Sequence, residues 1–319
     1  MGPFLVEGRR GIEGGRTTNV ALTVLPSSAP KKEVAKGGPI LLGTHDHADQ
    51  RQRPKVVTTM ADSTFRPRLR LLLVIAGGAL ALQAAVLGVL VTLAPEATAT
   101  ARGPVTFDGH VLSQVNILVG ALVLLCLAAV SFLLLASPAI FPRYAEKLTR
   151  NRHDARWVVF SLTSSITVFL VAQLNGICDI GTLVLIYAAT SAMTLFNVVA
   201  ERMPAGAIDS RDSRVLALSF GAAVGIVPWG IIAFTEIAAS IVGEGPSAPV
   251  RVITLLMLAA AFVFAVTNWS DIRRPSDAKL RLGDVTVPDL RGERAFIVLS
   301  AVAASAFAWG IFAGVIVTK

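Results

Sequence analysis

The sequence contains few charged residues and almost no cysteine. Asp, Glu, Lys and Arg make up 16% of its 319 residues, whereas hydrophobic residues make up 54%. A soluble domain has about 25% charged residues, so this composition argues against one. Cys126 and Cys178 lack the spacing of a metal or redox site, and we interpret both as small apolar side chains. The sequence also contains no nucleophile–base pair, metal-ligand cluster or phosphate-binding loop, so we expect no enzyme and no catalytic residue.

The sequence is instead rich in long apolar runs. A helix needs about 20 apolar residues to cross a bilayer, and seven runs approach or exceed that length. One such run could be a buried helix of a soluble protein, but seven in succession predict an all-α membrane protein with seven transmembrane helices. We assign the transmembrane domain to residues 63–319, with spans at 69–94, 113–136, 157–174, 180–200, 215–235, 250–269 and 295–317.

Residues 1–62 differ from the rest of the chain. They are rich in Gly, Pro, Thr and basic residues and show no sustained apolar period, which is typical of disorder. We expect a disordered extension, or an extension that is not translated if the protein starts at Met60. A transit peptide is an alternative, because acidic residues are few. The HDHAD tract at His45–Asp49 resembles a metal-binding tract, but we interpret it as solvated polar residues and expect no metal site.

The basic residues divide unevenly between the two sides of the membrane. Three of them, Arg102, Arg251 and Lys319, fall on one side. The other side carries seventeen, namely Arg66, Arg68, Arg70, Arg143, Lys147, Arg150, Arg152, Arg156, Arg202, Arg211, Arg214, Arg273, Arg274, Lys279, Arg281, Arg291 and Arg294. The positive-inside rule therefore predicts a multi-pass protein of the cell membrane with a cytoplasmic N-terminus. The same distribution explains the net charge of +8 without a nucleic-acid partner.

Three sequence blocks resemble heliorhodopsins, which are seven-helix retinal proteins with inverted membrane orientation. They are ARWVVFSLTSSITVFLVAQLNGICDI at 155–180, FGAAVGIVPWGII at 220–232 and LRGERAFIVLSAVAASAFAW at 290–309. The resemblance extends from about residue 69 to the C-terminus and implies a rhodopsin-type bundle of inverted topology. It also implies a two-stranded element in the first outer loop, where VTF at 105–107 alternates like a strand. By the same resemblance the protein is a homodimer that pairs through its fourth and fifth helices.

The same resemblance places the two charged groups of retinal chemistry at residues that carry no charge. Heliorhodopsins have the Schiff-base lysine at the position of Ala304 and the glutamate counterion at the position of Val159. No other lysine lies in a span. We therefore expect no covalent retinal and no other cofactor. The two losses belong together, because a buried glutamate without the charged imine is costly. The histidines of the family's inner cavity are also replaced, at sites that correspond to Leu80 and Ser131–Phe132.

Ser164, Ser300 and Trp229 are the remaining cavity candidates. The polar residues left in the spans are Ser, Thr, Asn and Gln, which favour helix packing or, alternatively, a cavity for a neutral ligand. Trp229 follows Pro228 inside the fifth span, so it either packs a proline kink or lines that cavity. If Val159 is to face Ala304, the third helix must begin before residue 157, near Arg150. Arg152 and Arg156 would then snorkel or border a wet inner vestibule.

The function indicated is that of a heliorhodopsin-like membrane protein without covalent retinal, acting as a sensor, regulator or scaffold. Its partners would be membrane lipid, a second copy of the chain and a cytoplasmic protein. A non-covalent binder of a carotenoid, retinal or another apolar ligand is the first alternative. A transporter or channel is the second, although the bilayer centre has no clear ionisable residue and the nearest, Glu236, falls at the outer end of the fifth span.

Overall fold

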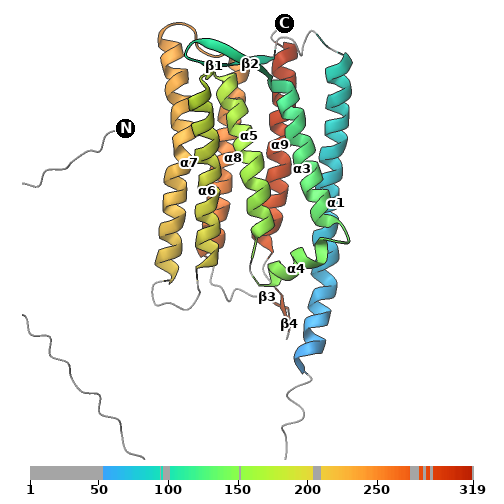
Figure 1. Cartoon of the computed structure of the whole chain (residues 1–319). Helices are drawn as coiled ribbons and strands as arrows, with labels where there is room; N and C mark the ends of the chain where they lie inside the picture. The colour runs from blue at the N-terminus through green and yellow to red at the C-terminus, as the bar shows by residue number, and fades with distance from the viewer. Residues whose placement is uncertain are drawn as a thin grey trace, which may run out of the picture. The chain divides into compact units, whose positions relative to one another are not determined.

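The computed structural model describes residues 53–93, 95, 101–150, 152–203, 210–273, 280–282, 285–287 and 290–317. Eight helices lie in this described part, and seven of them are long and apolar enough to cross a membrane. The seven, labelled as in Figure 1, are α1 (Arg53–Leu93), α3 (Ile117–Ala136), α5 (Asp154–Leu174), α6 (Ile180–Arg202), α7 (Ser210–Ile241), α8 (Ala248–Arg273) and α9 (Arg291–Val317). The prediction of an all-α bundle with seven spans is confirmed.

The ends of several spans differ from those predicted by hydropathy. The second span begins at Ile117, not at residue 113, because Ser113–Asn116 belongs to a strand. Asn116 then caps α3, since its Oδ1 accepts a hydrogen bond from the Val119 backbone N at 3.0 Å. The third and seventh helices begin at Asp154 and Arg291, each three or four residues earlier than predicted, because their first turns contain charged residues that pair inside the protein.

The first helix begins within the segment assigned to the N-terminal extension. α1 starts at Arg53, so the boundary predicted at residue 62 is wrong for residues 53–62. Pro54 suits the first turn of a helix, and no glycine or further proline occurs before Pro67. The membrane-spanning part of α1 is Arg66–Leu93. Residues 1–52, which include the HDHAD tract, lie outside the described residues.

One end of the bundle carries a β-hairpin, and we call it the hairpin end. β1 (Arg102–Phe107) pairs antiparallel with β2 (His110–Asn116), which confirms the predicted two-stranded element (Figure 1). Asp108 and Gly109 form the tight turn with φ angles of 48° and 77°, and Gly109 adopts its positive φ without strain. The Thr106 backbone N donates to the Cys178 carbonyl at 2.8 Å, which fixes the hairpin to the turn between α5 and α6.

The opposite end carries the short helix α4 (Phe141–Thr149), and we call it the α4 end. α4 is amphipathic, with Phe141, Tyr144 and Leu148 buried and basic residues on its other face. A second hairpin, β3 (Leu280–Leu282) with β4 (Val285–Val287), also lies at this end (Figure 1). Arg274 and Lys279, in the loop between α8 and β3, fall outside the described residues.

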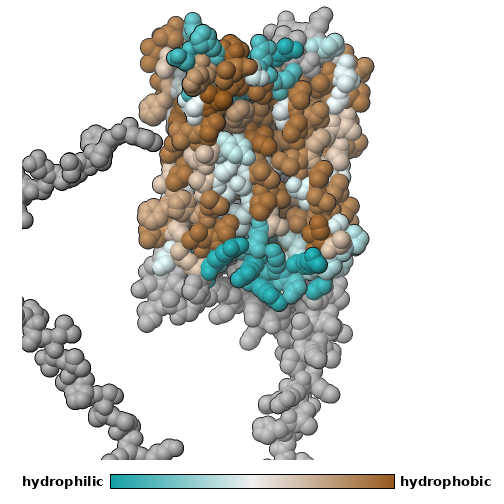
Figure 2. Space-filling view, in the orientation of Figure 1, coloured by the Kyte–Doolittle hydropathy of each residue, from teal (hydrophilic) through white to brown (hydrophobic). Residues whose placement is uncertain are grey.

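The helices are antiparallel neighbours that pack through small residues. The turn Asn175–Asp179 between α5 and α6 is so short that these two helices must lie side by side. α6 and α7 approach closely at Gly221, where an added Cβ would be 2.9 Å from the Phe196 Cβ. Figure 2 shows hydrophobic side chains over the middle of the bundle and hydrophilic ones towards its ends. Phe262, which is 70% exposed, is one of many large apolar side chains on this outer surface, as expected for a protein surrounded by lipid.

Candidate functional site

A cavity of about 410 Å³ lies within the bundle and contacts all five residues selected from the sequence. Val159 and Ser164 from α5, Trp229 from α7, and Ser300 and Ala304 from α9 all line it. Val159 reaches the cavity because α5 begins at Asp154, which places Val159 one and a half turns into the helix. The predicted earlier start of this helix is confirmed, although it lies at Asp154 and not near Arg150, which is the C-cap of the separate helix α4.

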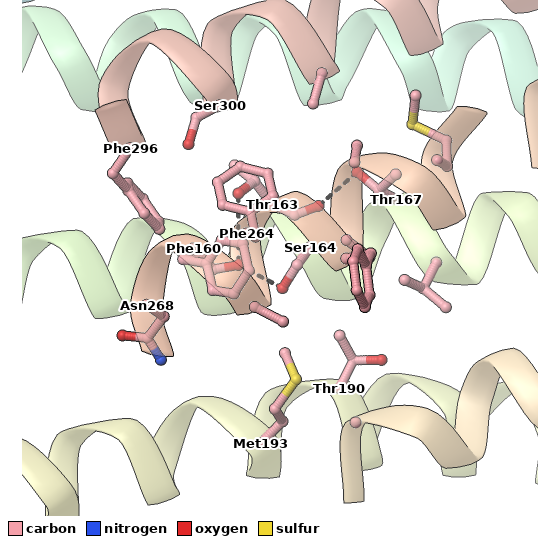
Figure 3. Close-up of a pocket in the computed structure, with 18 of the residues that line it drawn as sticks. Phe160, Thr163, Ser164, Thr167, Thr190, Met193, Phe264, Asn268, Phe296 and Ser300 are labelled. Carbon is pink, nitrogen blue, oxygen red and sulfur yellow. Dashed lines mark hydrogen bonds between the residues drawn. The ribbon is translucent and has the colours of Figure 1, made fainter. Parts of the chain in front are cut away.

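The wall of the cavity is uncharged, and most of its hydroxyl groups are already hydrogen-bonded to their own helix. Thr163 Oγ1 donates to the Val159 carbonyl at 2.9 Å, and Ser164 Oγ donates to the Phe160 carbonyl at 2.6 Å (Figure 3). Thr167 and Thr190 each donate in the same way to the carbonyl four residues earlier. No Asp, Glu, Lys, Arg or His occurs among the described residues that line this cavity. The cavity therefore suits an uncharged, mainly apolar occupant.

Aromatic side chains form the wall of the cavity nearer the α4 end. The ring centroids of Phe160, Phe264 and Phe296 lie 4.9–5.2 Å apart, in tilted or edge-to-face arrangements. Trp157, Trp229 and Trp269 also line the cavity. Trp229 thus lines the cavity, which is the second of the two roles considered for it.

Two asparagines, which we call the amide pair, line the cavity towards its α4 end. Asn268 on α8 donates from Nδ2 to Asn197 Oδ1 on α6 at 2.9 Å. The Oδ1 of Asn268 in turn accepts from Arg156 Nη2 at 3.4 Å. Asn197 and Asn268 are 6% and 8% exposed, so both amides are buried. The amide pair thus connects the uncharged cavity to a group of charged side chains beyond it.

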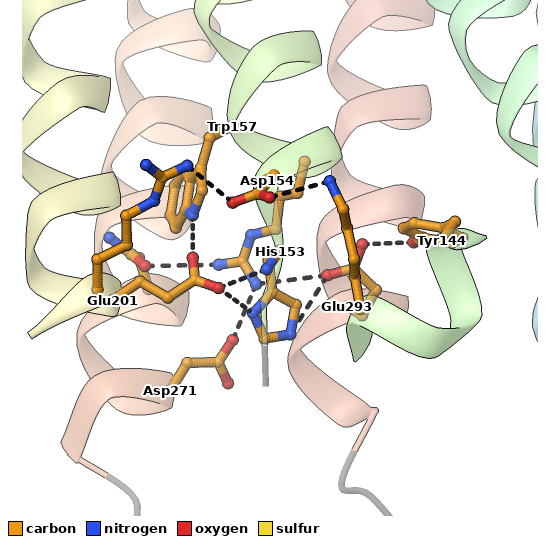
Figure 4. Close-up of polar contacts among 11 residues, drawn as sticks. Tyr144, His153, Asp154, Trp157, Glu201, Asp271 and Glu293 are labelled. Carbon is orange, nitrogen blue, oxygen red and sulfur yellow. Dashed lines mark hydrogen bonds and ion pairs between the residues drawn. The ribbon is translucent and has the colours of Figure 1, made fainter. Parts of the chain in front are cut away.

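These charged side chains form an ionic cluster of Arg156, His153, Glu201, Asp271 and Glu293 (Figure 4). Arg156 and Glu293 are buried, and the other three are partly exposed. Arg156 Nη1 lies 3.2 Å from Asp271 Oδ2 and 3.8 Å from Glu293 Oε2. Its guanidinium also stacks over the rings of Trp157 and Phe296, at 4.7 and 4.5 Å from their centroids. Arg156 is only 4% exposed, so it neither snorkels nor borders a wet vestibule, the two alternatives predicted for it, but is paired with carboxylates inside the protein.

His153 joins the ionic cluster from the loop before α5. Its Nδ1 lies 3.1 Å from Glu201 Oε1, and its Nε2 lies 3.8 Å from Glu293 Oε2. Trp157 Nε1 donates to the other oxygen of Glu201. Burial alone would lower the pKa of His153, but the hydrogen bond to Glu201 and the negative charges of Glu293 and Glu201 outweigh it, so the pKa is raised above 6.5.

Tyr144 extends the same network to α4. Its hydroxyl donates to Glu293 Oε1 at 2.6 Å. Burial, together with the neighbouring Glu293 carboxylate, raises the pKa of Tyr144 well above 10.0, so the hydroxyl stays protonated and remains a donor. The contacts of the ionic cluster and Tyr144 thus join α4, α5, α6, α8 and α9 at one end of the bundle.

Comparison with known families agrees with this architecture. The heliorhodopsin family model matches residues 69–316, which is nearly the whole transmembrane domain. The chain belongs to the heliorhodopsin family. No curated protein matches the chain. The family groups light-sensing membrane proteins and not classical enzymes.

The sequence of this heliorhodopsin revealed the cavity residues but not the ionic cluster or the amide pair. Leu80, expected at a histidine position of the family, is fully buried, and Phe132 lines the cavity. His153 lies outside the spans as expected, yet it takes part in the buried network. One signal pointed to the cluster. Glu201, Asp271 and Glu293 each lie within one turn of the end of a long apolar helix, on the side of the membrane assigned to Arg156.

Proposed function

We propose that this heliorhodopsin works without a covalently bound chromophore, as a sensory, regulatory or scaffold protein of the cell membrane. The observation that carries this proposal is that Ala304 and Val159 line one uncharged cavity. Retinal would need an amine in that cavity to form an imine, and a carboxylate to stabilise the imine when it is protonated. The described residues lining the cavity include neither group, so they do not fit a covalent retinal.

The ionic cluster does not replace the missing counterion in this proposal. Arg156 already pairs with Asp271 and Glu293, and Glu201 accepts from His153 and Trp157. Removing any one of these carboxylates from its partners would leave a buried charge uncompensated. The cluster therefore serves to hold five elements together at the α4 end.

The test is reaction of the purified protein with all-trans-retinal, followed by borohydride and intact-mass measurement. We expect no mass increase and no visible pigment. A visible pigment that borohydride fixes to the protein would overturn the proposal. Free retinal absorbs in the near ultraviolet and is removed by gel filtration, so it is not mistaken for a visible pigment attached to the protein.

A second function, non-covalent binding of an apolar ligand, is favoured by the cavity volume of about 410 Å³. Cavities that hold small ligands are typically about 300–1,000 Å³ and mainly apolar. A bound polyene would co-purify with the protein and be released by organic solvent without chemical cleavage. Solvent extracts without any polyene or other apolar molecule, together with no uptake of added retinal, would count against it. Transport is a weaker alternative, and ion flux across liposomes is its test.

We further propose a cytoplasmic N-terminus and a homodimer. The orientation is supported by the basic residues of the α4 end, such as Lys147, Arg150 and Arg202, against Arg102 and Arg251 at the hairpin end. The dimer is supported by the family resemblance and by Ala188, which is exposed on α6. Gly221 and Gly225, two small residues of the fifth helix, pack against Phe196 and Met193 of the same chain and do not support a dimer contact. A monomer mass by light scattering in mild detergent would argue against the dimer.

A further inference from the structure

We propose that the amide pair, Asn197 and Asn268, is a subsite for the uncharged polar head group of an otherwise apolar ligand. The head group is a hydroxyl or a carbonyl, and the apolar part lies in the rest of the cavity. This inference rests on the proposed non-covalent binding and specifies which end of the ligand the protein recognises.

The first observation is an unused hydrogen-bond donor on the cavity wall. Asn197 Oδ1 accepts from Asn268, but within the described part of the chain its Nδ2 has no hydrogen-bond partner. Asn197 lines the cavity and is 6% exposed, so few water molecules can reach this donor. A donor that faces a mainly apolar cavity without a partner is unfavourable, and a ligand oxygen placed there would remove that penalty.

The second observation is that each of the other polar groups of the amide pair already makes one hydrogen bond. Asn268 donates from its Nδ2 to Asn197, and its Oδ1 accepts from Arg156. Asn197 Nδ2 is therefore the group of the pair that is left for a ligand. A ligand must offer an acceptor to this donor, which an ammonium head group cannot do.

The charges beyond the amide pair exclude a carboxylate head group. The ionic cluster contains the carboxylates of Glu201, Asp271 and Glu293 against one guanidinium and one imidazole. Arg156 is already paired with two of these carboxylates and has no charge to spare for a ligand. A further buried anion next to these carboxylates would be repelled and poorly solvated. The head group that remains possible is an uncharged hydrogen-bond acceptor, such as a hydroxyl or a carbonyl.

The rest of the wall indicates that most of the ligand is apolar. The hydroxyls of Thr163, Ser164, Thr167 and Thr190 are hydrogen-bonded to their own backbone, as described above. The remaining surface is provided mainly by aromatic rings, aliphatic side chains and two methionines, with the hydroxyl of Ser300 as one further polar group. A long apolar chain or ring system suits this surface.

Binding of three probes to the full-length protein in phosphatidylcholine nanodiscs tests this subsite. The probes are all-trans-retinol, its hydrocarbon analogue with hydrogen in place of the hydroxyl, and all-trans-retinoic acid at pH 8. Three of the four tryptophans line the cavity, so quenching of tryptophan fluorescence reports occupancy, with empty nanodiscs as the blank. We expect retinol to bind about fivefold to tenfold more tightly than the hydrocarbon, as one net hydrogen bond predicts. Retinoic acid should bind at least about tenfold more weakly than retinol, because its carboxylate is repelled.

Two variants locate the effect. Asn197→Leu keeps the size of the side chain and removes the donor, so it should reduce retinol affinity about fivefold and leave hydrocarbon affinity unchanged. Thr190→Val is the matched control, because it removes a cavity hydroxyl that is already bonded to the Ile186 carbonyl. It should change neither affinity.

The outcomes separate the subsite from the function on which it rests. Retinol that binds no more tightly than the hydrocarbon would show that water satisfies Asn197, and would overturn the subsite while leaving non-covalent binding intact. Tightest binding of retinoic acid would overturn the uncharged head group. Failure of all three probes to bind would reject the non-covalent function itself. If Asn197→Leu does not fold, comparing the affinities of the unmodified protein for retinol and the hydrocarbon still tests whether the subsite recognises the hydroxyl.

Discussion

Arg156 and Glu293 lie 3.8 Å apart between Nη1 and Oε2, and both side chains are only 3% exposed. They come from α5 and α9, so this contact closes the α4 end of the bundle between helices far apart in the sequence. A buried pair of this kind is costly to break, because the charge that remains has no solvent to stabilise it.

We therefore expect Arg156→Met to destabilise the protein strongly. The substitution keeps the apolar stem but leaves Asp271 and Glu293 without their guanidinium, a loss of about 3–5 kcal/mol for a buried pair. Arg150→Met is the matched control. Arg150 pairs with Glu146 at 2.7 Å on the surface, and such an exposed pair contributes about 0–1 kcal/mol. Thermal unfolding in detergent measures both. Equal melting temperatures for the two variants would contradict the role of the cluster.

Stability should also fall as the pH rises above about 6.5. The pKa of His153 is raised in the folded protein, so its protonated form contributes stability that is fully present below the unfolded value of 6.5. That contribution is lost as the pH rises through the higher folded pKa. Melting temperatures between about pH 5.5 and pH 9 measure the effect. His153→Gln, which cannot titrate, should flatten this slope, and an unchanged slope would mean that another group is responsible.

Gly221 and Gly230 should respond in opposite ways to alanine. A Cβ at Gly221 would lie 2.9 Å from the Phe196 Cβ and 3.3 Å from the Met193 carbonyl, so α6 and α7 must separate, at a cost of about 1–3 kcal/mol. A Cβ at Gly230 meets no heavy atom within 4 Å, and alanine there should be neutral or stabilising by up to about 1 kcal/mol. Urea or thermal unfolding of both variants compares them. A stable Gly221→Ala protein would show that the two helices are not tightly packed.

Two substitutions should restore a retinal pigment. Ala304→Lys alone supplies the amine, but its imine would stay neutral without a counter-charge and absorb in the near ultraviolet. Adding Val159→Glu should protonate the imine and shift absorption into the visible. The control is Ala304→Lys with Val159→Gln, which has similar size and no charge. If the glutamate and glutamine proteins gave the same spectrum, the side chain at position 159 would not face the imine.

A reporter fused after Lys319 should be found outside the cell. The uneven distribution of basic residues predicts a cytoplasmic N-terminus, and seven spans then place the C-terminus on the opposite side. A fluorescent protein that folds only in the cytoplasm and an enzyme that works only outside it provide two complementary reporters. Cytoplasmic activity of the fusion at Lys319 would reverse the orientation.

The sequence predicted the seven spans, the first hairpin and the cavity residues because each depends on local pattern or on family resemblance. Hydropathy could not predict where α5 begins, because Asp154 and Arg156 look like loop residues until their partners are known. The amide pair was equally hidden, since Asn197 and Asn268 lie 71 positions apart. The Asn268 Nδ2–Asn197 Oδ1 contact depends on helix rotation, which the apolar period of a membrane helix fixes only weakly. The early start of α1 was missed because the composition of residues 53–62 resembles that of the preceding extension.

Trp157, Asn268 and Phe296 belong both to the cavity wall and to the surroundings of Arg156. A molecule that enters the cavity and displaces one of them would also change how firmly the neighbouring histidine holds its proton. Thermodynamic reciprocity then requires that acidity alter the affinity for that molecule by the same factor. The shared wall, which is one side chain thick, therefore couples the binding of a molecule in the cavity to the protonation of this histidine.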